Sequence, residues 1–421
     1  MYLVIYLILI AFILVKFLDF YLDSLNLQNL KLYGKNVPKG FEDVIDKEKL
    51  IKISEYTIEK SKFEFYSKLF SCAVMVIFFF TPLINFYNHI IFSFSLPYVW
   101  NGIVYFLILV YIYTFITIPF DLHSTFKIEK KYGFNTMTAK LWIVDFIKSL
   151  IVSTVIFGVL IAVSFTIIKY VDFWWFWVWI VFLAFTIGMM YLSPYVLEPL
   201  FNKFSPVESN ELTAKLASMM AVVGIKVSKV LKMDASKRTK HTNAYFSGIG
   251  HVKRIVLFDT LLEKMNDDEI VSVIAHEAGH WKKKHIIKRI ITVEILSLII
   301  LYIAYLLISG GYLLTAFNIA GVGTLPQSML LPCSFILIYF IANIVMFPFM
   351  PLMNRSSRKH EREADMFASK LCKGSSSMIS ALKKLSADNL SNLHPHSLYS
   401  LFHYSHPPVV ERVAYLKTFK N

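Results

Sequence analysis

The sequence predicts a mainly α-helical, polytopic membrane protein whose soluble part contains a small β-sheet. Three observations support this prediction. Of the 421 residues, 56% are hydrophobic and the mean hydropathy is +0.56, which is more apolar surface than a soluble domain can bury. Seven stretches are long and apolar enough to cross a bilayer. Between these stretches, segments rich in basic residues alternate with segments that lack them.

Each of the seven stretches approaches the roughly 20 apolar residues that a transmembrane helix needs. They are expected at about 1–18, 69–91, 98–120, 146–168, 173–193, 286–309 and 328–352. The fifth begins with several tryptophans, as in an aromatic belt. The first has no basic segment and no small-residue cleavage site, so we interpret it as a retained helix and not as a signal peptide.

The distribution of Lys and Arg predicts the orientation of the spans. Three connections contain neither residue: 92–97, 170–172 and 310–327. Nearly all of the 43 basic residues lie in four other segments: 19–66, 121–145, 194–285 and 353–421. By the positive-inside rule, this alternation supports seven crossings with Met1 on the lumenal side and the four basic segments in the cytosol. The chain then divides into five spans with their loops, a cytosolic segment, two further spans and a cytosolic C-terminal segment, at 1–193, 194–285, 286–352 and 353–421.

Two of the basic segments carry local predictions. The 19–66 segment is expected to contain a cytosolic helix that runs into the second span, because apolar residues recur there at helical spacing. The 121–145 segment contains His123 and Glu129, which are metal-ligand residue types. No partner accompanies them at ligand spacing, so we predict a solvated basic loop.

The 194–285 segment is predicted to fold as a soluble unit. Leucines and methionines share one face of a helix expected at 208–223. Short strands are expected at Lys229–Asp234, Thr242–Ser247 and Arg254–Phe258, with a turn at 248–250 between the last two. An exposed edge of such a sheet can accept an extended peptide as a further strand.

A five-residue motif, His276-Glu277-Ala278-Gly279-His280, follows this sheet. Residues four apart lie on the same face of a helix, so the two imidazoles can bind one zinc ion while Glu277 reaches the attacking water. Asn266 is a suitable N-cap for this helix, and Glu269 stands at the capping-box position. The alternative is two histidines that share an exposed helix face without a metal. A third ligand is needed to decide.

The third ligand is expected after the seventh span, within Ser357–Asp365. On a helix, Glu361 and Asp365 share a face, whereas Glu363 points elsewhere. This pattern suits Glu361 as a zinc ligand and Asp365 as the acceptor for the free N–H of a ligating histidine. The alternative is a salt-bridged surface helix, since arginines also stand at pairing distance. Helix geometry would place both Glu361 and His280 about 10 Å beyond the hydrocarbon edge, at the membrane surface.

A third group of candidates lies near the C-terminus, in His403–Arg412. Peptide hydrolysis passes through an oxyanion that needs a hydrogen-bond donor, and His406 is a candidate. His394, His396 and His403 are close by, so the sequence alone does not choose among them. The alternative is a surface loop rich in His and Pro.

Six sequence blocks along the chain together resemble a type I CAAX prenyl endopeptidase. This family comprises seven-span membrane zinc metalloproteases of the endoplasmic reticulum and nuclear envelope. The zinc motif is shared by many proteases, whereas the order and spacing of all six blocks are specific to this family. The blocks are Thr125–Glu129 with Gly133–Asn135, Pro199–Phe204, Ser236–Arg238 with Asn243–Phe246, the zinc motif with Trp281, Ser357–Asp365, and His403–Arg412. Ala278 and His123 depart from the family pattern; the departure at His123 concerns local substrate contacts.

The resemblance implies a ring of membrane helices around a large internal chamber. It implies one zinc ion per chain, held by His276, His280 and Glu361, with Glu277 as the general base. It also implies a substrate-binding strand and two further residues that line the catalytic centre. The strand residues are Asn243, Ala244, Tyr245 and Phe246, and the two further residues are His406 and Arg412.

The expected function is a zinc endopeptidase that removes the C-terminal tripeptide from prenylated CAAX proteins. Its expected partners are farnesylated or geranylgeranylated protein C-termini and membrane lipid, with no nucleic acid. One alternative is a broader quality-control zinc protease for membrane proteins, although a bacterial-type relative of that kind is expected to have fewer spans. Another is a zinc-sensing transporter, which is disfavoured because the spans carry few ionisable residues beyond Glu294. The three cysteines (Cys72, Cys333 and Cys372) are too far apart for a Cys-based zinc site.

Overall fold

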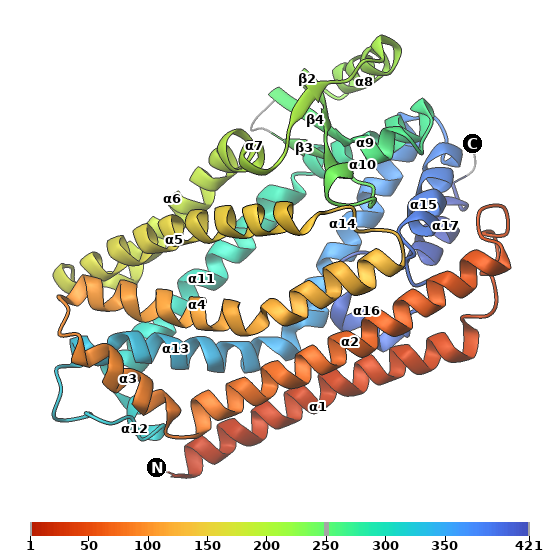
Figure 1. The fold of residues 1–421 in the computed structure, drawn as a ribbon. Coiled ribbons are helices and arrows are strands. Elements are labelled where there is room, and N and C mark those ends of the chain that lie inside the picture. Colours follow the sequence, from red (N-terminus) through yellow and green to blue (C-terminus); the bar gives the residue numbers. More distant parts are fainter. Residues whose placement is uncertain (1, 248–251, 420–421) are drawn as a thin grey trace.

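The computed structural model describes residues 2–247 and 252–419 and is mostly helical. Figure 1 shows long helices running side by side, with a small sheet and its surrounding helices gathered at one end. The helices are α1 (Tyr2–Tyr33), α2 (Lys47–Phe80), α3 (Leu83–Ser93), α4 (Tyr98–His123), α5 (Ala139–Tyr170), α6 (Trp174–Leu192), α7 (Glu198–Phe201), α8 (Asn210–Val222), α9 (Asp259–Leu262), α10 (Asp267–Lys282), α11 (His285–Ser309), α12 (Tyr312–Ala316), α13 (Gln327–Met346), α14 (Met350–Leu371), α15 (Ser376–Asp388), α16 (Ser397–His403) and α17 (Val409–Leu416).

The predicted number of membrane spans is confirmed. Seven helical segments in the described part of the chain are long and apolar enough to cross a membrane. They are Leu3–Tyr33, Lys47–Phe80, Tyr98–Glu129, Ala139–Tyr170, Trp174–Phe201, His285–Ser309 and Met329–Leu371. Most are longer than predicted, because the helices continue past the apolar stretch into the charged segments.

The position predicted for the second span is wrong. The sequence predicts one continuous span over 69–91, but α2 ends at Phe80 and α3 is a separate helix. Pro82 is the cause: a proline lacks the helical N–H donor and disfavours helical backbone at the residue before it, and Thr81 is extended (φ −120°, ψ 173°). The helix expected to run into this span is present, since α2 continues unbroken from Lys47.

The solvated loop predicted at 121–145 is also wrong. After α4 the chain continues through a π-helical turn, Ser124–Glu129, and α5 begins at Ala139. Glu129 accepts a hydrogen bond from the Tyr56 hydroxyl at 2.7 Å, and Ile128 is buried. Partners on α2 therefore hold this segment helical. His123 stacks on Phe63 with ring centroids 4.6 Å apart, away from any group of metal-ligand side chains among the described residues.

The sheet comprises β1 (Phe204–Pro206), β2 (Lys226–Met233), β3 (Ala244–Ser247) and β4 (Val252–Phe258), in the order β1-β2-β4-β3. The three predicted strands are present with shifted ends, whereas β1 was not predicted. The predicted turn at 248–250 lies outside the described residues. β2 and β4 are parallel and β3 is antiparallel to β4, so within the described chain β3 is an edge strand.

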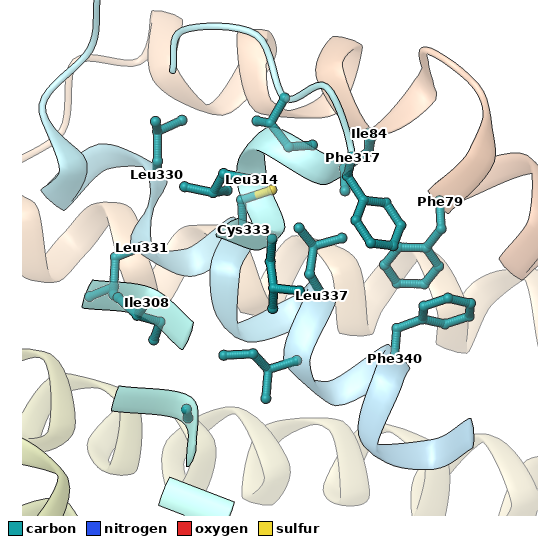
Figure 2. Close-up of a cluster of buried hydrophobic side chains, with 14 of the residues drawn as sticks. Phe79, Ile84, Ile308, Leu314, Phe317, Leu330, Leu331, Cys333, Leu337 and Phe340 are labelled. Atoms are coloured by element: carbon teal, nitrogen blue, oxygen red, sulfur yellow. The ribbon is translucent and has the colours of Figure 1, made fainter. Parts of the chain in front are cut away.

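An apolar cluster occupies the end of the molecule opposite the sheet, where α3 and α12 lie (Figure 1). Figure 2 shows side chains from the second, sixth and seventh spans meeting in this cluster, and the rings of Phe79 and Phe340 stack with centroids 4.2 Å apart. Elsewhere the spans pack sparsely. In six of them 11% or less of the most apolar stretch is buried inside the protein, against 50% in the seventh span. A compact bundle would bury one face of every helix, so these spans form a wall and not a packed core.

Candidate active site

The helix that carries the five-residue motif, α10, starts from a capping box, as predicted. The Asn266 side chain accepts the Glu269 N–H at 2.9 Å, and the Glu269 carboxylate accepts the Asn266 N–H at 3.0 Å. Glu269 also accepts hydrogen bonds from Ser380 at 2.6 Å and Lys384 at 2.8 Å. One buried carboxylate therefore both begins α10 and joins it to α15.

The structure brings His276, His280 and Glu361 together. The two histidines lie one turn apart on α10, with their Nε2 atoms separated by 3.1 Å. Glu361, on α14, places Oε2 3.3 Å from His276 Nε2 and Oε1 3.2 Å from His280 Nε2. The three ligand atoms lie within 4.8 Å of one another. Each side chain is at least four-fifths buried, so the cluster is a formed site and not a surface coincidence.

Asp365 and Arg412 support this cluster from the side opposite to the ligand atoms. Asp365 is fully buried, and its Oδ1 lies 2.8 Å from His276 Nδ1. Arg412, on α17, donates to both carboxylate oxygens of Asp365 at 2.6 and 2.9 Å. The resemblance implies that Arg412 lines the catalytic centre; its guanidinium faces Asp365 and approaches Glu361 to 3.8 Å.

The carboxylates of Asp365 and Glu361 favour a positive charge on the His276 ring that lies between them. Burial disfavours the charged form of His276, yet the adjacent carboxylates of Asp365 and Glu361 outweigh burial and raise the pKa of His276 to about 9. For Glu277, burial is the largest effect and raises the pKa of its carboxyl group. A carboxyl group with a raised pKa is suited to accept a proton and then release it.

His406 is the one candidate histidine of the C-terminal group that lies at the cluster. Its Nε2 lies 3.4 Å from Glu361 Oε1, Ser405 Oγ lies 2.9 Å from its Nδ1, and 63% of its side chain is exposed. It can therefore contact a bound molecule. The other three lie elsewhere: His394 bonds to a backbone carbonyl, His396 caps α16 and His403 lies 3.3 Å from Asp19.

The residues present fit a metal ion. Two imidazole nitrogens and one carboxylate are the donors of a catalytic zinc site, which keeps a fourth position open for substrate and water. Glu361 Oε2 is buried and has no hydrogen-bond partner among the described residues. A buried polar atom without a hydrogen-bond partner indicates a missing ligand.

A glycine allows α10 and α14, the two helices that carry the His276, His280 and Glu361 cluster, to meet. At Gly279, an added Cβ would stand 3.0 Å from Ala364 Cα and 3.2 Å from both the Ala364 carbonyl oxygen and Phe367 Cβ. Any side chain here would push α14 away from α10. The small residue inside the motif is therefore what brings Glu361 within reach of the histidines.

Two residues that the sequence analysis did not assign to the site contact it. His285 Nδ1 lies 3.1 Å from His280 Nδ1, and His285 Nε2 lies 3.1 Å from Glu363. Glu363 points away from the ligand atoms, as predicted, but it is not an isolated surface carboxylate. The available signal was a third histidine five residues after His280; it was overlooked because residues five apart do not share a face of a continuous helix.

Strand β3 packs against the helix that carries the motif. Ala244 and Phe246 pack in the same apolar cluster as Ile274 and Ala278 of α10. Phe258 N–H donates to the Asn243 carbonyl at 3.1 Å, so residue 243 pairs with β4. Because such pairs alternate along antiparallel strands, the backbone groups of Ala244 and Phe246 point away from β4. The Ala244 N–H donates to the Asn243 side chain at 2.9 Å.

Two histidines and a glutamate, the donor types of a catalytic zinc site, lie buried at one end of a wall of membrane spans, and this arrangement is typical of a membrane metallopeptidase. Residues 26–203 match a family described as CAAX prenyl protease N-terminal, five membrane helices, and residues 206–420 match peptidase family M48. The chain therefore belongs to peptidase family M48, in its CAAX prenyl protease group. It is a multi-pass membrane metalloendopeptidase, and its family implies a metal cofactor.

Similar proteins cover nearly the whole chain. CAAX prenyl protease 1 homolog of Arabidopsis thaliana is 34% identical over 96% of this chain and 95% of its own length. CAAX prenyl protease 1 of Saccharomyces cerevisiae is 33% identical over 92% and 90%. The crystal structure of S. mikatae Ste24p is 31% identical and superposes with a TM-score of 0.87 over 97% of this chain and 98% of that chain.

We predict that Gly279→Ala destabilises the protein, because the new methyl group forces α10 and α14 apart. The expected loss is about 1–3 kcal/mol, typical of overpacking, together with loss of protease activity. Thermal unfolding and activity of the purified protein measure both. Gly188→Ala on α6 is the matched control, since an added Cβ there meets nothing within 4 Å. Equal behaviour of the two variants would contradict the role given to Gly279.

Proposed function

We propose that this protein is a zinc endopeptidase that removes the C-terminal tripeptide from prenylated CAAX proteins, cutting after the lipidated cysteine. The observation that carries the proposal is the position of the His276, His280 and Glu361 cluster. It lies beside β3, which is an edge strand within the described residues, and at one end of a wall of membrane spans. A substrate with a peptide end and a lipid end needs both surroundings. The names of the relatives support the same substrate class.

The roles of the site residues follow from their positions. His276, His280 and Glu361 would hold one zinc ion, which when bound polarises the scissile carbonyl and makes water more acidic. Glu277, on the same helix but outside the ligand set, takes the proton from the attacking water and passes it to the leaving amine. His406 donates a hydrogen bond to the oxyanion of the tetrahedral intermediate.

Asp365 and Arg412 act through His276. The Asp365 carboxylate accepts the Nδ1–H of His276, which leaves Nε2 bare and directed into the ligand cluster. Arg412 holds both oxygens of Asp365 and so keeps that carboxylate in place. The pair thus sets the tautomer and the ring orientation of one ligand.

Substrate peptide would bind as a further strand along Asn243, Ala244, Tyr245 and Phe246. The outward-facing backbone groups of Ala244 and Phe246 supply hydrogen bonds that do not depend on the substrate side chains. Tyr245 is fixed by a 2.8 Å hydrogen bond from its hydroxyl to Glu198. The prenyl group would lie in the chamber within the wall of spans, where apolar burial contributes up to about 0.8 kcal/mol per CH₂.

The proposed location is the endoplasmic reticulum membrane, with the nuclear envelope as a continuation of it. The N-terminus would be lumenal, and the active site and C-terminus cytosolic. The charge distribution supports this orientation, because the connections after α3, α5 and α11 lack Lys and Arg, and Lys169 lies in the last turn of α5. Prenylated protein C-termini and membrane lipid are the proposed partners.

A lipid competition tests the function directly. Purified protein is expected to cleave a farnesylated CAAX peptide in preference to the same peptide without the lipid, because the chamber contributes binding only for the former. The ratio of kcat/KM for the two peptides is the measurement, and a chelator should abolish cleavage of both. Equal kcat/KM values would instead favour the quality-control protease, for which the lipid is irrelevant.

Substitutions of Glu277 and Glu361 are predicted to have different effects on zinc binding. Glu277→Gln should abolish cleavage and retain one zinc per chain, because Glu277 is a base and not a ligand. Glu361→Ala should lose the zinc itself. Metal analysis of both purified variants beside the wild type provides the comparison. Loss of zinc from Glu277→Gln would overturn the assignment of Glu277.

Ala244→Pro is predicted to cripple peptide cleavage while zinc stays bound. The Ala244 N–H faces away from β4 and donates to the Asn243 side chain, so a proline removes this local bond and the donor proposed for the substrate, but no bond between strands of the sheet. Ala244→Gly keeps the donor and is the control for the lost side chain. Tyr245→Pro, whose N–H faces β4, should instead damage the fold. Normal cleavage by Ala244→Pro would exclude strand addition at this edge.

A further inference from the structure

His285 lies at the junction between the motif helix and the membrane, where α10 ends and α11 begins. Its side chain is 4% exposed, and it stacks on His360 of α14 with ring centroids 4.1 Å apart and planes 11° from parallel. The two ring nitrogens of His285 have different partners. Nδ1 lies 3.1 Å from His280 Nδ1, and Nε2 lies 3.1 Å from Glu363 Oε2.

An interruption of the helix between α10 and α11 makes the contact between His280 and His285 possible. In a continuous helix, residues five apart point about 140° away from each other. Lys284 adopts a left-handed conformation (φ 57°, ψ 33°) between the two helices. The chain therefore changes direction there, and the ring of His285 returns to the side of α10 on which His280 lies.

The hydrogen-bond partners determine which nitrogens carry protons. A carboxylate only accepts hydrogen bonds, so the His285 nitrogen that faces Glu363 must be N–H. In a neutral His285, Nδ1 is then unprotonated and can only accept a hydrogen bond. The His280 nitrogen that it faces must therefore donate, which places the proton of His280 on Nδ1. The Nε2 of His280 is then unprotonated, so that its lone pair can bind a metal ion. This nitrogen is the atom that lies 3.2 Å from Glu361.

We infer that His285 and Glu363 are positioning residues for His280, holding its ring orientation and its tautomer in the form that binds metal. The inference rests on the proposed zinc site and extends it. His276 would be oriented directly by the Asp365 carboxylate, and His280 indirectly, by the Glu363 carboxylate through His285. Both orienting carboxylates lie on α14, which also carries Glu361. One helix would thus supply the third ligand and orient the other two.

Zinc affinity of the purified full-length protein in detergent tests the inference without relying on activity. Affinity is measured by competition with a chromophoric chelator, and the zinc-dependent rise in Tm is a second readout. His285→Ala should weaken zinc binding about 10- to 100-fold, the usual cost of losing a partner of a ligating histidine, and Asp365→Asn should do the same for His276. Glu363→Ala should have a smaller effect in the same direction.

Two substitutions of His285 separate hydrogen bonding from packing. His285→Asn can place its amide oxygen near the position of Nδ1 and should recover part of the zinc affinity lost in His285→Ala. His285→Phe keeps a ring against His360 but has no acceptor, so it should bind zinc as weakly as His285→Ala. Glu208→Gln is the control for a carboxylate, since Glu208 is 90% exposed and lies 3.2 Å from Lys232; the zinc affinity of this variant should equal that of the wild type.

Each remaining outcome contradicts a specific statement. If His285→Phe restores affinity and His285→Asn does not, His285 only packs, and the inference is wrong. If His285→Ala binds zinc like the wild type while Glu361→Ala loses it, the inference fails and the proposed zinc site stands. If Glu361→Ala also retains full affinity, the proposed site itself is wrong.

Discussion

The contact between α10 and α14 is the constraint on which the rest of the site depends. Gly279 has no side chain, and for that reason the backbone of α14 at Ala364 can lie directly against α10. Glu361 and Asp365, one turn apart on α14, then face His276 from two sides. A metal site needs ligand atoms placed within a few tenths of an ångström, and helices place side chains more precisely than loops do.

The charges in this contact are mutually dependent. Asp365 and Glu361 are carboxylates with almost no exposed surface, and burial of an unpaired charge is strongly unfavourable. Arg412 and His276 provide the compensation, with distances of 2.6 and 2.8 Å to Asp365. Removal of one member of a buried pair commonly costs about 3–5 kcal/mol, because its partner is left uncompensated. The C-terminal segment that carries Arg412 therefore stabilises the buried carboxylates of the site and does not merely line it.

The features that the sequence predicted well depend on local patterns. The cap at Asn266, the spacing within the motif, the strands β2 to β4 and the number of spans each follow from residues close together in the chain. The features it missed depend on distant partners or on backbone conformation. Glu129 is held by Tyr56, 73 residues away, and nothing in a run of lysines indicates a left-handed Lys284. The end of α2 is different, since Pro82 is a local signal in the sequence that indicates a helix boundary.

The order of these elements along the chain has a consequence for how the protein is made. His280 and Glu361 are separated by both α11 and α13, so the two parts of the ligand cluster meet only when those spans lie antiparallel to each other. His406 and Arg412 follow later still, close to the last residue. A chain in which α11 or α13 is not yet inserted therefore lacks the assembled cluster. Assembly of the cluster therefore depends on completed insertion of both spans into the bilayer.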